Sequence, residues 1–207
     1  MYVSKILFRK QTLLIVILAG TILPMAFIIS SSLLRPSPSS LTTVRANTTP
    51  LDKQEKTRPG LPLRLKIPKI NVDAALDYVG VTPQGALGAP DSPANAAWYD
   101  RGPRPGEQGN AVIDGHFGWK NNIPAVFDNL HKLQQGDDLY VEDVKGVTTT
   151  FVVRAVRTYG QNQDGSNVFV PSDHQAHLNL ITCEGTWNQT QRSYSSRLVV
   201  FADQGVK

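Results

Sequence analysis

Residues 178–182 read Leu-Asn-Leu-Ile-Thr, and Cys183, which follows them, is the only cysteine in the 207-residue chain. The apolar residues of this stretch predict a short strand that ends at Cys183. A second apolar run, residues 198–202, begins directly after Arg197. If the two strands pair as an antiparallel hairpin, residues 184–196 form the loop between them. Cys183 and Arg197 then lie at the same edge of the sheet, within reach of each other.

A histidine also follows a strand-like run. Residues 110–113 read Asn-Ala-Val-Ile, and His116 comes three residues later. A lone cysteine cannot form an internal disulfide, so outside the cell it is unused, cross-linked between chains or reactive. A thiolate is a good nucleophile, a nearby imidazolium favours the thiolate form, and a guanidinium can stabilise an oxyanion. Together, Cys183, His116 and Arg197 therefore predict a site for nucleophilic catalysis.

Each of these three residues also has a simpler interpretation. Cys183 can be a small apolar residue buried at a strand end. His116 follows Asp-Gly and can be a turn residue, and Arg197 can be an exposed charge at a strand edge. Trp187, in the predicted loop after Cys183, either lines a groove or caps the core.

The other three histidines have no comparable surroundings. His131 is expected at the surface of a short helix. His174 and His177 have the spacing of a metal-binding pair, but no cluster of cysteines or carboxylates accompanies them. We therefore predict no metal site.

The C-terminal part of the chain is rich in predicted strands. Residues 63–67 alternate apolar and polar side chains, and residues 151–156 form another short apolar run. Clusters of Gly, Pro, Asn and Asp separate these runs, which is typical of a barrel or a sandwich. Only residues 125–133 resemble a short helix, with their larger apolar side chains on one face.

An apolar segment near the N-terminus predicts a membrane anchor. Residues 13–34 are uncharged and mostly apolar, and about 20 such residues cross a bilayer as a helix. Three basic residues lie in segment 1–12, which places the N-terminus in the cytoplasm and the C-terminal part outside the plasma membrane. The alternative is a cleaved signal peptide, for which Ser30–Ser32 is a weak cleavage site.

Residues 35–60 predict a flexible tether, because they are rich in Pro, Ser and Thr and show no strand or helix period. The charge of the chain separates at the same boundary. Residues 1–60 contain eight Lys and Arg against two Asp and Glu, whereas residues 61–207 contain 13 against 15. The basic excess suits a membrane surface and gives no reason to expect a nucleic-acid partner. Residues 61–207 have the usual length of one domain, which the anchor places outside the cell.

Residues 61–207 resemble a sortase, a membrane-anchored cysteine transpeptidase of bacteria with Gram-positive-type walls. The Thr-Cys signature of that family is matched by residues 180–183, its histidine by Gly115-His116 and its arginine by residues 197–200. Further similar segments, in the order and spacing of the family, are residues 64–74, 98–99, 105–113, 126–130 and 136–137.

The resemblance implies an all-β fold, an eight-stranded β-barrel with one or two short helices, preceded by the N-terminal transmembrane helix. Trp98-Tyr99 and Pro105-Gly106-Glu107 are most similar to classes D to F of the family, and class F is nearest. No further apolar span follows the domain, which argues against the typical pilin-polymerising class. The calcium-binding acidic loop of class A is not evident, although Glu142 and Asp143 leave it open.

The resemblance also implies a two-step reaction without a cofactor. Cys183 would attack the Thr–Gly bond of a Leu-Pro-x-Thr-Gly-like sorting signal on a secreted protein. His116 would protonate the leaving amine and then activate an amine of a peptidoglycan precursor or another acceptor. Arg197 would hold the substrate backbone and the oxyanion. The residues implied to bind the substrate are Thr182, Ile181, Val199 and Trp187.

Two other functions remain open at this point. One is a membrane-tethered cysteine hydrolase, which transfers the acyl group to water. The other is a non-catalytic wall-binding β-domain, in which Cys183 is structural.

Overall fold

The computed structural model describes residues 58–120 and 123–205. The predicted cytoplasmic segment 1–12, the anchor 13–34 and nearly all of the tether lie outside the described residues. Within the described part of the chain, no helix has the length and apolar character needed to cross a membrane.

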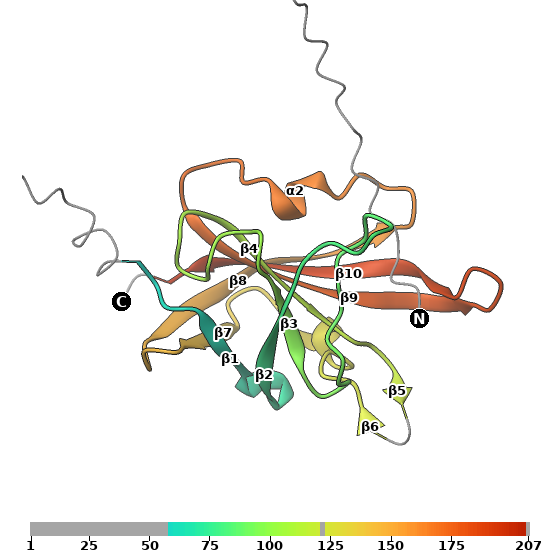
Figure 1. Ribbon diagram of the computed structural model, residues 1–207, viewed down its shortest axis with the longest axis horizontal. Coiled ribbons are helices and arrows are strands. Elements are labelled where there is room, and N and C mark those ends of the chain that lie inside the picture. The colour runs from blue at the N-terminus through green and yellow to red at the C-terminus, as the bar shows by residue number, and fades with distance from the viewer. Residues whose placement is uncertain (1–57, 121–122, 206–207) are drawn as a thin grey trace, which may run out of the picture. The chain divides into compact units, whose positions relative to one another are not determined.

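Eight strands close into a barrel in the order β1-β2-β3-β4-β9-β10-β8-β7 (Figure 1). Neighbouring strands are antiparallel, except for the parallel pairs β2–β3 and β4–β9. The strands of the barrel are β1 (Pro62–Ile67), β2 (Val72–Val79), β3 (Ala96–Tyr99), β4 (Gly109–Gly115), β7 (Asp138–Asp143), β8 (Thr148–Gly160), β9 (Ala176–Asn188) and β10 (Ser193–Gln204). The prediction of an eight-stranded, all-β barrel is confirmed.

The remaining elements are short. Strands β5 (Trp119–Lys120) and β6 (Ile123–Pro124) form a separate two-stranded sheet. The described helices are α2 (Ser166–Phe169) and the two 3-10 turns η1 (Pro68–Ile70) and η2 (Leu130–Lys132). They agree with the expectation of few and short helices.

The predicted helix over residues 125–133 is wrong for its first half. Only η2, three residues long, is helical there. The backbone amide of Val126 donates to the carbonyl of Pro93 (2.8 Å), and the amide of Phe127 donates to the carbonyl of His116 (3.1 Å). These bonds to distant parts of the chain replace the local bonds that a helix needs, and they attach this segment to the end of β4.

Strand alternation divides the apolar residues into two clusters. Side chains that point into the barrel form the main core, to which Ile113, Leu180 and Val200 belong. Side chains one position away point outward into a second cluster, which includes Val112, Ile181 and Val199. Val168 of α2 belongs to this second cluster, so the short helix covers part of the outer face. Within β4, β9 and β10, every second residue therefore points to the same face, so a residue can be assigned to the inner or outer face from its distance in sequence to a core residue.

The hairpin of β9 and β10 is longer than the sequence predicts. The expected loop over residues 184–196 is wrong, because β9 continues to Asn188 and β10 begins at Ser193. Tyr194 pairs with Trp187 in this extension, and Ser196 pairs with Glu184. In Figure 1 the red β9–β10 hairpin projects beyond the other strands. Cys183 consequently lies within a continuous hairpin and is not followed by a loop.

Candidate active site

Cys183 and Arg197 lie directly opposite each other on adjacent strands. Their Cα atoms are partners in the antiparallel register of β9 and β10. Residues opposite each other in an antiparallel pair have Cβ atoms about 4.5–5.5 Å apart. The sequence-based expectation that a hairpin brings this thiol and this guanidinium together is confirmed by the register.

His116 reaches the same place from the other side of β9. Strands β4 and β9 run parallel, and their last paired residues are Gly115 and Thr182. His116 is the residue after Gly115, and Cys183 is the residue after Thr182. The Thr182 hydroxyl donates to the Gly115 carbonyl at 2.7 Å, which fastens the end of β4 to β9 at this row.

The side chains of Cys183 and Arg197 share one face of the barrel. On β9, Leu180 points into the core and Ile181 points outward, so Cys183 is also an outward position. On β10, Val199 points outward, which gives Arg197 the same direction. His116 directly follows Gly115, the last residue of β4. The face beside the second apolar cluster thus carries a thiol and a guanidinium on the adjacent strands β9 and β10, and His116 lies at the end of β4, which pairs with β9 on its other side.

Gly115, at the end of β4, allows the segment 126–128 to pack tightly against this strand. A Cβ atom at residue 115 would collide with the ring of Phe127 and would lie 2.8 Å from the nearest side-chain atom of Val126. The same segment holds the chain after His116, because Asp128 Oδ1 accepts a hydrogen bond from the Gly118 amide at 2.6 Å. The position of His116 therefore depends on segment 126–128.

A backbone carbonyl orients the imidazole of His116. Its Nε2 lies 2.8 Å from the carbonyl oxygen of Pro90. A carbonyl only accepts hydrogen bonds, so Nε2 carries a proton and Nδ1 is the basic nitrogen of the neutral ring. The contact selects one tautomer and leaves Nδ1 as the atom that can take or give a proton.

The guanidinium of Arg197 is held by its own strand. Nη1 donates to the carbonyls of Ser196 (2.7 Å) and Tyr194 (3.3 Å). These bonds use one of the three guanidinium nitrogens, and an arginine has five N–H donors in a fixed fork. The other nitrogens can serve a ligand on the outer face.

The charge of the site has opposing effects on the thiol. Burial raises the pKa of Cys183 above its ordinary value, the positive charge of Arg197 lowers it, and the carboxylate of Asp114 raises it. Burial is the largest of the three effects. Arg197 is thus the group that favours the thiolate, against the effect of its surroundings.

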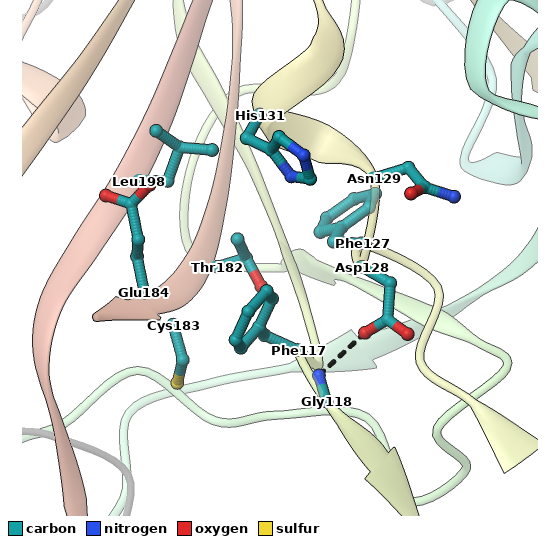
Figure 2. A pocket seen from close by; sticks show the side chains of 10 residues that line it. All are labelled: Phe117, Gly118, Phe127, Asp128, Asn129, His131, Thr182, Cys183, Glu184 and Leu198. Atoms are coloured by element: carbon teal, nitrogen blue, oxygen red, sulfur yellow. Dashed lines mark hydrogen bonds between the residues drawn. The ribbon is translucent and has the colours of Figure 1, made fainter. Parts of the chain in front are cut away.

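A pocket opens beside Cys183 at the end of the barrel, with a volume of about 360 Å³. Figure 2 shows Cys183 and Glu184 at one side of it and Asp128 and Asn129 at the other. His131, which the sequence places at the surface, is exposed and also lines this pocket. The remaining lining residues are Phe117, Gly118, Phe127, Thr182 and Leu198.

A family model described as "Sortase domain" matches residues 65–205, more than half of the chain. The chain belongs to the sortase family. The matched range contains nearly all of the barrel, and it includes His116, Cys183 and Arg197. No match is found among curated proteins.

Solved sortase structures share the fold of this sortase. The complex of Streptococcus agalactiae sortase C1 with MTSET has a TM-score of 0.55 and 22% identity, and the alignment covers 70% of this chain and 67% of that chain. Sortase A from Corynebacterium diphtheriae, a lid mutant, has a TM-score of 0.56 and 22% identity, with 74% of each chain covered. Sortase C-1 from Actinomyces oris has a TM-score of 0.54 and 22% identity, with 75% and 82% covered. Likeness at this identity establishes the fold.

The residues that the sequence assigns to substrate binding occupy different environments in this sortase. Thr182 is buried and bonded to Gly115, so its hydroxyl is already used. Ile181 and Val199 are buried in the second cluster, on the outer face beside Cys183. Trp187 is 48% exposed and packs edge-on against Tyr194, with ring centroids 5.1 Å apart. It therefore does not cap the barrel core.

The two histidines outside the site have polar partners. His177 contacts Asp173 and Asp203 through its two ring nitrogens, each at 2.7 Å, and His174 contacts Gln108. Across residues 58–120 and 123–205, no group of three His, Cys, Asp or Glu side chains is arranged to hold a metal ion.

Several residues of the site are not identified by sequence reasoning. Asp114, Pro90 and Tyr194 act on Cys183, His116 and Arg197 through charge or hydrogen bonds, and Asp128 holds the chain after His116 through the Gly118 amide. A signal for Asp114 is present in the sequence, because it lies two residues before His116, at the end of the apolar run 110–113. Pro90, Asp128 and Tyr194 are brought in by tertiary contacts that strand patterns do not reveal.

Replacing Thr182 with valine is expected to destabilise the fold and lower activity together. Valine keeps the shape of the side chain but removes the bond to the Gly115 carbonyl, and losing a buried hydrogen bond of this kind costs about 1–3 kcal/mol. The free energy of unfolding in urea and kcat/KM on a sorting-signal peptide measure the two effects. Thr148→Val, at an exposed position at the start of β8, is the matched control. Unchanged values in Thr182→Val would show that the two strand ends are held by the ladder alone.

Proposed function

We propose that this sortase is a cysteine transpeptidase that cleaves a Leu-Pro-x-Thr-Gly-like sorting signal between Thr and Gly. It then joins the released carboxyl end of the protein to an amine of a peptidoglycan precursor. The observation that supports the proposal is the pairing of Cys183 with Arg197 in register on β9 and β10, together with the position of His116 directly after the end of β4, beside the row that holds Cys183.

In the first step, the Cys183 thiolate attacks the threonine carbonyl carbon, and a carbon–sulfur bond forms as the carbonyl becomes an oxyanion. Arg197 faces the same side and stabilises the negative charge through its free N–H groups. The tetrahedral intermediate then expels the glycine nitrogen. His116 in its protonated form gives the Nδ1 proton to this leaving amine, while Nε2 remains bonded to Pro90.

In the second step, an acceptor amine attacks the thioester. His116 Nδ1 takes the proton from the attacking amine, the new amide bond forms, and the Cys183 thiolate leaves. Asp128 and Glu184 line the pocket beside Cys183, and their carboxylates can attract an amine acceptor, which attacks the thioester in its neutral form. Each turnover regenerates the starting protonation states, so the enzyme needs no cofactor.

We also propose a place in the cell for this chemistry. Residues 13–34 would anchor the chain in the plasma membrane with its N-terminus in the cytoplasm, and residues 35–60 would let the catalytic domain move outside. Secreted client proteins and a lipid-linked wall precursor emerge at that surface. Trp98-Tyr99 and Pro105-Gly106-Glu107 support assignment to classes D to F, and to class F in particular.

Incubating the full-length chain in detergent with a sorting-signal peptide tests the reaction. We expect cleavage between Thr and Gly, and formation of a peptide–amine conjugate when an amine acceptor is added, both measured by mass spectrometry. The conjugate distinguishes transfer to an amine from transfer to water. Cleavage without a conjugate, at any acceptor concentration, would assign the chain as a hydrolase. Absence of cleavage with a panel of Leu-Pro-x-Thr-Gly-like peptides would support the non-catalytic wall-binding alternative.

A further inference from the structure

Asp114 is a carboxyl group on the reactive face that the proposed reaction does not use. It lies on β4, between the core residue Ile113 and the tightly packed Gly115, and alternation points it outward. In register it is the partner of Ile181 on β9 and of Ala97 on β3. Cys183 follows Ile181 by two residues on β9 and so points to the same face, while His116 lies just beyond the end of β4.

Asp114, Cys183 and Arg197 therefore form a compact group on the three neighbouring strands β4, β9 and β10. Adjacent strands are about 4.8 Å apart, and two residues along a strand span about 6.6–7 Å. Asp114 is thus diagonal to Cys183 across one strand spacing. Arg197 is one strand further and has a side chain long enough to interact with both groups.

The charges in this group influence one another in the folded protein. The positive charge of Arg197 acts on Asp114 and on Cys183, lowering the pKa of each, whereas an ionised Asp114 raises the pKa of the thiol. The carboxylate and the thiolate thus compete for one guanidinium. Burial raises the pKa of Asp114 to about 8, against the lowering effects of Arg197 and of the Gly115 amide.

We propose that Asp114 is a positioning residue that controls, through its own charge, how strongly Arg197 favours the Cys183 thiolate. The inference rests on the proposed function, in which Cys183 is the nucleophile. When Asp114 is protonated, Arg197 acts on the thiol alone. When Asp114 is ionised, it attracts the guanidinium and repels the thiolate, so the reactive form of Cys183 becomes less favourable.

The other charged or titratable residues near Asp114 lie on β2, on β3 and in the connection between these strands. Opposite it on β3 is Ala97, which carries no charge, and Tyr99 lies one outward position further along. Asp77 on β2 pairs with Ala97 in register, and its carboxylate accepts a hydrogen bond from Asn95 at 3.1 Å. In the chain between β2 and β3, Asp91 is exposed. Arg197 is the cation whose charge acts on Asp114.

The sign of the pH effect follows from this arrangement. The pKa of Asp114 is near the pH at which an ordinary thiol begins to ionise, so the two groups titrate together as a coupled pair. Raising the pH through about 8 ionises Asp114, which opposes the loss of the thiol proton. Removing the charge of Asp114 should therefore make the thiol ionise at lower pH.

The test measures the rate of Cys183 alkylation by iodoacetamide, a neutral reagent, between pH 6 and pH 10 in the full-length chain. In Asp114→Asn, which has the same shape and no charge, we expect the midpoint to move down by about half a unit or more. At a pH above the midpoint of Asp114 and below that of the thiol, this is a rate increase of about threefold, whereas well below pH 8 the two proteins should react equally, because Asp114 is then uncharged in the parent as well. Asp138→Asn, on β7 at the exposed surface, removes the same charge outside the group and should leave the profile of the parent.

A profile of Asp114→Asn that coincides with the parent, or that moves to higher pH, would overturn the proposal. A merely structural role of Asp114 would change stability without changing this midpoint. Alkylation requires only the thiol, so the result does not depend on peptide cleavage. A shift in a chain that cleaves no peptide would overturn the proposed function and leave the coupling established.

A reciprocal measurement keeps the proposal testable if Asp114→Asn does not fold. Coupling between two groups is mutual, so an ionised thiol raises the pKa of Asp114 by the same free energy by which an ionised Asp114 raises the pKa of the thiol. The carboxyl carbon of Asp114, followed by NMR in a chain with 13C-labelled aspartate, should titrate at lower pH in Cys183→Ser than in the parent. Titration at an ordinary aspartate pH in both proteins would overturn the proposal.

Discussion

Replacing Cys183 with alanine is expected to abolish peptide cleavage, to below one part in a thousand of the parent rate. The alanine variant has no atom that can form the thioester, and no second cysteine exists in the chain to replace it. Mass spectrometry of the products over several hours gives the residual rate. The same variant should not be labelled by a thiol-reactive substrate analogue, whereas the parent should gain one label.

The control for this result is the fold of the variant. Removing a partly buried small side chain can cost up to a few kcal/mol of stability, so circular dichroism and thermal unfolding must show a folded barrel. Cys183→Ser, which keeps a polar atom at the same place, serves as a second inactive variant. Cleavage at the parental rate by a folded Cys183→Ala would remove Cys183 from the mechanism.

Replacing Arg197 with alanine is expected to lower kcat/KM by about a hundredfold to a thousandfold, the usual effect of losing one oxyanion donor. The same substitution removes the positive charge that lowers the pKa of the Cys183 thiol. The midpoint of thiol alkylation should therefore move to higher pH in this variant. Steady-state kinetics and the alkylation profile measure the two effects separately.

Arg197→Lys distinguishes the charge of Arg197 from its geometry. Lysine restores the positive charge but lacks the planar fork, so it should recover part of the alkylation midpoint and little of kcat/KM. Arg101→Ala, which removes an exposed arginine paired with Asp100, is the matched control and should behave as the parent. If Arg197→Ala kept kcat/KM within a few-fold of the parent, Arg197 would be a surface charge and not part of the reaction.

Sequence patterns predict the central part of the site because alternation and pairing are local rules. The apolar runs before Cys183 and after Arg197 are strands of one hairpin, and their order alone places the two residues at one level. The extension of this hairpin to Asn188 and Ser193 is not predictable in the same way. Its residues pair only with each other beyond the barrel, so they bury little apolar surface and show no clear alternation.

The neighbours that orient His116 depend on contacts between distant segments. The carbonyl of Pro90 and the carboxylate of Asp128 reach the His116 region from the β2–β3 connection and from the turn after β6. Residues 125–129 have an apolar spacing compatible with a helix, but hydrogen bonds to Pro93 and His116 override this local preference. Tertiary structure therefore decides both the turn and the tautomer of the histidine.

The parallel pairing of β4 with β9 also determines when the site can form during folding. Gly115 and Thr182 are separated by 67 positions in the chain, and β5, β6, β7 and β8 lie between them in sequence. Pairings of such long range form slowly, because the intervening chain must first be ordered. A chain during synthesis therefore contains His116 long before Cys183 lies beside it. Cys183 comes to lie beside His116 and Arg197 only when β9 pairs with both β4 and β10. The site is therefore assembled as the barrel closes.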